Sequence, residues 1–272
     1  MEREPARLIG AASDPAAISP VDTATMPVVV AYGAGTDSTA MLVGMARLGW
    51  VPDAILFADT GNELPRTYVF IGIMQEWLAR AGFPPIAIVK NRSPIAGDAS
   101  LYDECHRKSV LPSLAYGGHS CSLKWKVAPQ DRWCREHFGW QRAKRGDPPA
   151  ELVDGLMPGR WRHGPWIQKI IGYDAGPGDA RRIARAMGLL PPGYRYRYPL
   201  AEWGWDRVRC EAEIRNAGLP LPGKSACFMC PASRKHEVDA LAEEHPDLVA
   251  KAVELEARAH ARGLRTVAGL GR

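Results

Sequence analysis

The stretch from residue 27 to residue 49, PVVVAYGAGTDSTAMLVGMARLG, constrains the fold more than any other part of the sequence. Its first six residues form a continuous apolar run, which is typical of a strand covered on both faces. A glycine turn follows, and the rest has the periodicity of an amphipathic helix that ends near Gly49. A buried strand that leads through a glycine turn into a helix predicts the first unit of a parallel sheet.

The same alternation recurs along the chain. DAILFAD, PIAIVK and KIIGYD have the pattern of buried strands, whereas ELPRTYVFIGIMQEWLARAG and DARRIARAMG have that of helices. Strands that alternate with helices imply right-handed crossovers. We therefore predict an α/β fold with a doubly wound, mostly parallel, Rossmann-like sheet.

Three regions are expected. Residues 1–26, rich in Ala, Pro, Ser and Asp, predict a flexible tail. Residues 27–200 predict a nucleotide-binding domain, and residues 201–272 a C-terminal helical segment that carries cysteines.

Composition limits the class of protein. With 46% hydrophobic residues and no apolar run of membrane-spanning length or signal peptide, the 272-residue chain is expected to be soluble and cytoplasmic. Because the cytoplasm keeps thiols reduced, the six cysteines are better explained as metal ligands or buried thiols than as disulfides. The formal charge of +5 suits an anionic ligand, but it does not by itself indicate nucleic-acid binding.

Residues 218–231, GLPLPGKSACFMCP, match two incompatible patterns, a phosphate loop (G-x-x-x-x-G-K-[ST]) and half of a metal site. A phosphate loop must follow a strand, yet Asp206 and Gly218 bound a predicted helix. Pro220 and Pro222 also remove two amide donors from the loop. The sequence therefore favours a helix C-cap that leads into a cysteine pair.

The first glycine turn is the better nucleotide site, because ligands of open parallel sheets bind at the carboxyl ends of the strands. Gly33 and Gly35 permit close approach, and the amides from Thr36 to Thr39 can surround phosphate oxygens. A Mg²⁺ ion would explain Asp37 beside phosphates. The alternative is that Asp37 only caps the helix and that the glycines only turn the chain. Polar residues also end the second strand, at Asp59, Thr60, Asn62 and Glu63.

AYGAGTDST and FADTGNE resemble the signature loops of the PP-loop adenine nucleotide alpha hydrolases, in the phosphoadenosine phosphosulfate (PAPS) reductase-like branch that includes DNA phosphorothioation enzymes. LPSLAYGGHSCSLKWKVAPQDRW, IGYDAG and YPLAEWGWDRVRCEAEIRNAGLPLPGKSACFMCP extend the resemblance, which runs from about residue 27 to 260 and makes residues 27–200 a PP-loop domain. It implies ATP as cofactor, bound by Tyr32, Gly33, Gly35, Thr36, Asp37, Ser38, Thr39, Asp59, Thr60 and Glu63. Of these, Asp37, Ser38 and Asp59 would be catalytic.

Two departures from the family are evident. The family pattern S-G-G-x-D-S aligns with residues 33–38, GAGTDS, so that Ala34 replaces a glycine and a serine hydroxyl is lost. The Glu-Cys-Gly segment of true sulfonucleotide reductases has no counterpart after residue 230, which disfavours PAPS reduction by that route.

The cysteines favour the metal-site pattern over the phosphate-loop pattern for residues 218–231. Cys227 and Cys230 can bind a metal from one tight turn, and Cys210 precedes them by one helix. A fourth thiolate must come from far away in the sequence, and Cys121 is selected because it lies in a basic loop where a thiolate would be stabilised. Four cysteines fit zinc or iron, and the resemblance favours a [4Fe-4S] cluster, with Lys224 offsetting its charge. Cys105 and Cys134 lack paired spacing and are expected to be core residues.

We therefore predict an ATP pyrophosphatase that adenylylates an acceptor, such as a nucleic acid or nucleoside, for iron–sulfur-assisted sulfur transfer from a separate donor. The alternatives are a sulfonucleotide reductase that uses Cys105 or Cys134, and a non-catalytic nucleic-acid-binding protein with structural zinc. YRYRY (194–198) favours an edge strand over a base-stacking surface. His163 in WRHGPW is a possible base, and the tryptophans are expected to pack in the core.

Overall fold

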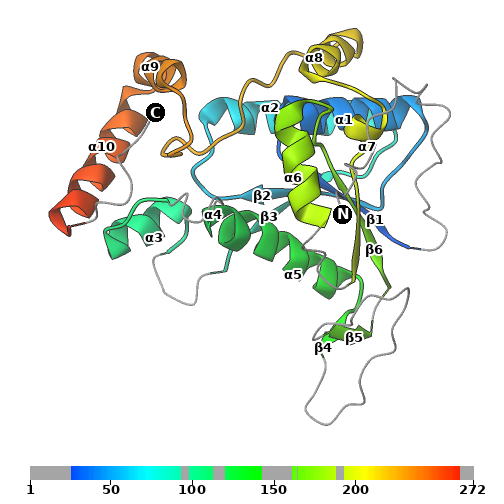
Figure 1. Ribbon diagram of the computed structural model, residues 1–272, viewed down its shortest axis with the longest axis horizontal. Coiled ribbons are helices and arrows are strands. Elements are labelled where there is room, and N and C mark those ends of the chain that lie inside the picture. Colours follow the sequence, from blue (N-terminus) through cyan, green and yellow to red (C-terminus); the bar gives the residue numbers. More distant parts are fainter. Residues whose placement is uncertain are drawn as a thin grey trace, which may run out of the picture. The chain divides into compact units, whose positions relative to one another are not determined.

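The main sheet lies in the part of the chain that the computed structural model describes, residues 26–92, 98–112, 120–142, 161–163, 165–187 and 193–263. Within these residues it has five parallel strands in the order β3-β2-β1-β6-β7 (Figure 1). The strands are β1 (Val28–Tyr32), β2 (Ala54–Asp59), β3 (Ile86–Lys90), β6 (Ile167–Ile171) and β7 (Tyr194–Arg197). The predicted α/β fold is therefore confirmed.

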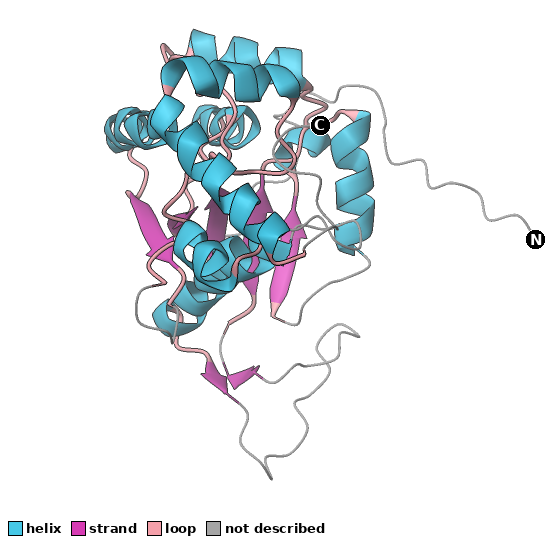
Figure 2. Ribbon diagram, turned by 90° about the vertical axis from the view of Figure 1, so that its left-hand side faces the viewer, coloured by secondary structure: helices cyan, strands magenta, loops and turns pink. Residues whose placement is uncertain are grey.

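Helices connect and follow the strands (Figure 2). They are α1 (Thr36–Arg47), α2 (Pro65–Arg80), α3 (Leu101–Lys108), α4 (Ser120–Ser122), the π-helix η3 (Leu123–Val127), α5 (Ala128–His137), α6 (Pro177–Met187), α7 (Pro199–Glu202), α8 (Arg207–Asn216), α9 (Lys235–Glu244) and α10 (Pro246–Ala261). Two short antiparallel strands, β4 (Gln141–Arg142) and β5 (Trp161–His163), form a separate sheet.

Burial explains why the central strands are apolar throughout. Val28, Val29 and Val30 of β1 have no exposed surface, and every residue of β2 is buried. Strands covered on both faces need apolar side chains at consecutive positions, as the sequence predicts. The alternating YRYRY segment forms β7, so the strand interpretation is confirmed.

The order of the strands fixes where a ligand can bind. The chain runs from β1 outward to β2 and β3 on one side, and β6 and β7 lie on the other side of β1. β1 and β6 are parallel and in register from Val28 with Gln168 to Ala31 with Ile171, so their carboxyl ends lie side by side. This reversal of strand order is where open α/β sheets bind ligands.

The chain divides into two compact units. Unit 1 comprises residues 1–56, 71–87 and 135–224, and unit 2 comprises residues 57–70, 88–134 and 225–272. The division differs from the predicted boundary at residue 200. In unit 2, the amide of Leu64 donates to Ala226 and the amide of Phe228 donates to Asn62, at 3.2 and 3.0 Å. These bonds join the turn that carries Cys227 and Cys230, here called the cysteine turn, to the segment that follows β2.

The helix predicted before residue 218 is confirmed as α8. The Asp206 side chain accepts the amide of Arg209 at 2.8 Å, and Gly218 ends the helix with φ at +73°. Residues 218–225 thus follow a helix, so the phosphate-loop interpretation is wrong. Within the described residues no helix is long and apolar enough to cross a membrane. Apart from Met26, the predicted tail lies outside these residues.

Candidate functional site

The glycine turn after β1 is held from the inside by Ser38. Its hydroxyl accepts the amides of Gly33 and Gly35, at 3.2 and 3.3 Å, and donates to the carbonyl of Gly35 at 3.2 Å. The hydroxyls of Tyr32 and Thr39, at either end of the turn, are hydrogen-bonded to each other at 3.2 Å. These bonds fix the backbone that leads into α1, whose first amides remain the natural partners of an anion.

Ala34 takes a glycine-like conformation in this turn. Its φ is +55°, in the left-handed region that costs other residues roughly 1 kcal/mol or more. This is the position at which the PP-loop pattern has glycine. The turn therefore carries backbone strain at a position where the pattern has a residue that adopts this conformation freely.

A second loop, after β6, meets the first. A Cβ on Gly172 would lie 2.8 Å from the Cα of Ser38 and 3.1 Å from the carbonyl carbon of Asp37. The two backbones are thus in direct contact, and only glycine allows this approach. The loop continues through Asp174 to α6, which carries Asp179 in its first turn.

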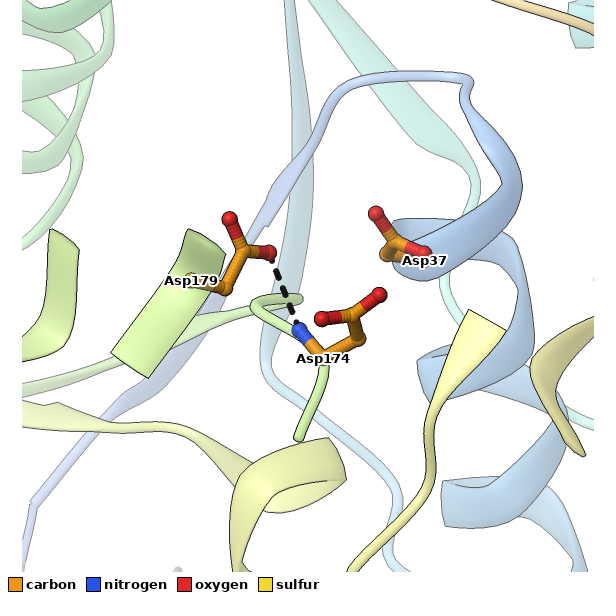
Figure 3. A group of neighbouring side chains, drawn as sticks. All are labelled: Asp37, Asp174 and Asp179. Carbon is orange, nitrogen blue, oxygen red and sulfur yellow. Dashed lines mark hydrogen bonds between the residues drawn. The ribbon is translucent and has the colours of Figure 1, made fainter. Parts of the chain in front are cut away.

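Three carboxylates gather where the two loops meet (Figure 3). Each of Asp37, Asp174 and Asp179 offers an oxygen within 4.8 Å of the others. Asp174 accepts the amide of Gly176 at 2.8 Å, and Asp179 accepts the amide of Asp174 at 3.1 Å. The Oδ1 of Asp37 is buried without a hydrogen-bond partner among the described residues.

The charges around Asp37 favour a cation. Its pKa is raised to about 6, mainly by burial and in part by the carboxylates of Asp174 and Asp179, while the guanidinium of Arg207 opposes the rise. Arg207 donates to Asp37 at 3.1 Å, and Arg182 donates to Asp179 at 2.9 Å. Clustered carboxylates with an unsatisfied oxygen are suited to a hard divalent ion such as Mg²⁺.

Asp174 and Asp179 were not among the residues predicted for the site. Asp174 lies in IGYDAG, directly after a predicted strand, so the rule that ligands bind at carboxyl ends could have identified it. Asp179 lies in a helix and carried no such signal.

Replacing Asp37 with Asn should stabilise the metal-free protein at neutral pH. The folded carboxyl binds its proton more tightly than the unfolded one, so its stabilising contribution is fully present below about pH 4 and is lost as the pH rises through about 6. We expect Asp37→Asn in EDTA to melt roughly 3 to 8 °C above wild type at pH 7.5, with the gap closing toward pH 4. Differential scanning calorimetry across this range measures the effect. A constant gap would contradict the assigned pKa.

Gly172→Ala should destabilise unit 1, because the new methyl group would meet backbone atoms that cannot rotate away. We expect a loss of about 1 to 3 kcal/mol in the free energy of unfolding, measured in urea. Gly178→Ala is the matched control, since its Cβ would meet nothing within 4 Å. Equal stability of the two variants would refute the close contact between the loops.

In unit 2, the carboxylate of Asp59 is fully engaged. It accepts the amide of Gly61 at 2.7 Å and the hydroxyl of Tyr68 at 2.8 Å, and it pairs with Lys90 at 3.0 Å. Burial alone would raise its pKa, but these three partners outweigh burial and lower it. Asp59 is thus an ionised group with fixed partners, and its role in binding a nucleotide stays a prediction.

Glu63 and Thr60 face the cysteine turn. The Thr60 hydroxyl lies 3.2 Å from both the Oε1 of Glu63 and the sulfur of Cys227. Lys126 pairs with Oε1 of Glu63 at 2.9 Å. Burial would lower the pKa of Lys126, but the charges of Glu63 and Cys227 raise it. Lys126, which the sequence analysis did not select, is therefore the cation beside Cys227.

Cys121, Cys227 and Cys230 all belong to unit 2. Cys121 and Cys227 pack against an apolar cluster that includes Trp125, Phe228 and Leu255. Burial raises the pKa of Cys121, the charge of Cys230 raises it further, and Lys126 only partly opposes them. The expectation that a basic loop stabilises a Cys121 thiolate is therefore wrong for the metal-free protein. Burial also raises the pKa of Cys227.

Cys210 lies in unit 1, on α8, with no exposed surface. Burial and the charges of Asp37 and Asp174 raise the pKa of its thiol. α8, which carries this sulfur, packs on α1. The role of Cys210 as a metal ligand stays a prediction.

The remaining cysteines are core residues, as expected. Cys105 and Cys134 are 4% and 0% exposed, and burial raises the pKa of Cys105 to about 12. Neither presents the exposed thiol that a sulfonucleotide reductase of the alternative kind would need. Trp125, Trp203 and Trp205 are buried, as predicted. The side chain of His163 lies outside the description.

No protein-family model matches the sequence, and no curated protein matches it. Among solved structures, the chain is similar to the U34-tRNA thiolase NcsA from Methanococcus maripaludis, described with its [4Fe-4S] cluster. The two are 14% identical with a TM-score of 0.42, and the similarity covers 88% of this chain and 72% of the thiolase. A similarity this distant carries no argument about function.

Proposed function

We propose that this chain is a PAPS reductase-like ATP pyrophosphatase that adenylylates an acceptor for sulfur transfer. The observation that carries the proposal is the cluster of Asp37, Asp174 and Asp179 between two loops, at the carboxyl ends of β1 and β6. This is the ligand position of a doubly wound sheet, beside the N-terminus of a twelve-residue helix.

The chain's own residues account for nucleotide binding. The three aspartates would hold Mg²⁺, which would neutralise the phosphate oxygens of ATP. The unpartnered Oδ1 of Asp37 and the raised pKa of that carboxyl support this fit. The first amides of α1 would orient the phosphates, and Ser38 would hold the turn in shape rather than contact the nucleotide. Catalysis of this kind is mostly positioning and charge stabilisation.

The proposed reaction has two balanced steps. An acceptor oxygen attacks the α-phosphorus of ATP, the bond to the β-phosphate oxygen breaks, and pyrophosphate leaves with its electron pair. A sulfur nucleophile from a separate donor then attacks the acceptor carbon, and the bond from carbon to the adenylylated oxygen breaks, which releases AMP. The acceptor oxygen thus ends in AMP.

The cysteine site would serve the second step. We propose that Cys121, Cys227 and Cys230 hold a [4Fe-4S] cluster, which supplies a place to present a sulfur nucleophile when bound. Cys121 and Cys227 lie at the edge of an apolar cluster, and Cys230 is near enough for its charge to act on Cys121, which supports such a group. The raised pKa values of Cys121 and Cys227 fit it too, because a metal would supply the positive charge that these two sulfurs lack.

The products of ATP turnover test the proposal. Anaerobic protein would be screened with Mg²⁺-ATP and candidate acceptors, namely nucleosides, transfer RNA and DNA, with a sulfide donor. We expect AMP and pyrophosphate in equal amounts only when the correct acceptor is present. An ¹⁸O label in the replaced acceptor oxygen should appear in AMP. Formation of ADP and phosphate, or AMP without label, would overturn the proposed reaction.

A further inference from the structure

Glu63 is a buried carboxylate, and one of its two oxygens has no hydrogen-bond partner among the described residues. Its side chain has no exposed surface. Oε1 accepts from Lys126 at 2.9 Å and from the Thr60 hydroxyl at 3.2 Å. Oε2 has no hydrogen-bond partner among the described residues. A buried acceptor left in this state costs roughly 1 to 3 kcal/mol, and more when the group is charged.

The position of Glu63 beside Cys227 is fixed by the backbone. The two residues form an antiparallel bridge, and the bonds of Leu64 to Ala226 and of Phe228 to Asn62 flank it. The Cys227 sulfur lies 3.8 Å from Oε1 of Glu63. A metal centre held by that sulfur would therefore lie next to the Glu63 carboxylate.

The ion pair with Lys126 does not explain this arrangement alone. Glu104, elsewhere in unit 2, provides the comparison. One of its oxygens bonds to Lys108 and Lys124, and the other accepts the indole of Trp125 at 2.8 Å. Both oxygens of that buried glutamate therefore have hydrogen-bond partners within the protein, whereas Oε2 of Glu63 has none among the described residues.

We propose that Glu63 is the fourth protein ligand of the metal centre held by Cys121, Cys227 and Cys230. The inference rests on the cluster of the proposed function and takes the place predicted for Cys210. Carboxylate oxygen is a harder ligand than thiolate and binds iron of a cluster less tightly. Glu63 would therefore hold the iron that exchanges its ligand most readily, while Lys126 and Thr60 hold the carboxylate through its other oxygen.

Glu63→Gln tests the proposal, because it preserves shape and one hydrogen bond but removes the anionic ligand. Glu104→Gln is the matched control for loss of a buried, lysine-paired glutamate in the same unit. Anaerobic proteins would be compared by iron content, by electron paramagnetic resonance after reduction, and by the rate of conversion to a three-iron cluster under ferricyanide. We expect the conversion to be about tenfold faster or more in Glu63→Gln and unchanged in Glu104→Gln. We also expect an altered resonance signal in Glu63→Gln alone.

A second variant separates ligation from packing. Glu63→Ala leaves a space that small carboxylates can enter, so formate should restore the wild-type resonance signal if an oxygen ligand is what was lost. Wild-type behaviour of Glu63→Gln, equal effects of both glutamine variants, or no response to formate would each overturn the assignment. If wild type contains zinc, the cluster of the proposed function fails instead. Zinc affinity of Glu63→Gln, measured by chelator competition, then decides the ligand role, and an unchanged affinity refutes it.

Discussion

Asp37→Ala should abolish detectable Mg²⁺-dependent ATP binding and lower pyrophosphate release by about 100-fold or more, while the protein stays folded. The variant removes the one carboxylate of the three that has a buried, unpartnered oxygen. It also removes a charge that Asp174 and Asp179 repel, so the fold should not suffer. Isothermal titration calorimetry with ATP and Mg²⁺, together with a pyrophosphate assay, measures both effects.

Two controls locate the nucleotide. Glu211→Ala removes a carboxylate that pairs only within α8, with Arg215, and should bind ATP like wild type. Lys224→Ala removes the lysine of the rejected phosphate-loop pattern and should also leave affinity unchanged. If Lys224→Ala loses ATP while Asp37→Ala retains it, the nucleotide binds to residues 218–225 and the site assigned to the first turn is wrong.

Local signals sufficed for the sheet and for one of the three carboxylates of the acidic site. The run from Val28 to Tyr32 is apolar because it is covered on both faces, and glycines mark the turn that follows. Asp37 could be selected because it lies one residue inside the helix that this turn opens. Asp174 comes from a strand far along the chain, and only the pairing of β1 with β6 brings it to Asp37.

In unit 2, the pattern of charges along the sequence does not predict the electrostatic environment of Cys121. The lysines near Cys121 made its loop look favourable to a thiolate, but Lys124 bonds to Glu104 and Lys126 to Glu63. Each positive charge is therefore paired with a buried glutamate rather than with sulfur. Neither partner is adjacent in sequence, so the loss of the expected stabilisation could not be predicted from composition.

Cys210 shows on a helix, too, that tertiary contacts cannot be predicted from the local sequence. The bounds of α8 were predicted correctly from Asp206 and Gly218, but the face that it buries was not. Val208 is 76% exposed, whereas Cys210 and Ile214 have no exposed surface. The packing of α8 on α1, which the sequence does not reveal, selects that face. Cys210 therefore lies on the buried face of α8, and its role as a metal ligand stays a prediction.

The cysteine variants should divide into two groups. Protein purified without oxygen should be brown, with broad absorption near 400 nm and about four irons per chain, because thiolate-to-iron charge transfer colours such clusters. Cys121→Ser, Cys227→Ser and Cys230→Ser should each lose most of the colour and iron, since each removes a thiolate from one unit. Cys210→Ser should keep both, because its sulfur is enclosed beside Asp37 and Asp174 in the other unit.

Iron analysis and visible spectra of the four variants measure this division, and Cys134→Ser serves as the control for loss of a buried thiol that is no ligand. Iron loss in Cys210→Ser that matches the loss in Cys227→Ser would restore the four-cysteine set and remove Glu63 from the ligands. A colourless wild type with one zinc would overturn the cluster, because zinc has no such charge-transfer band. Colour that survives Cys227→Ser would place the metal away from the turn, because that variant removes the sulfur nearest to Glu63.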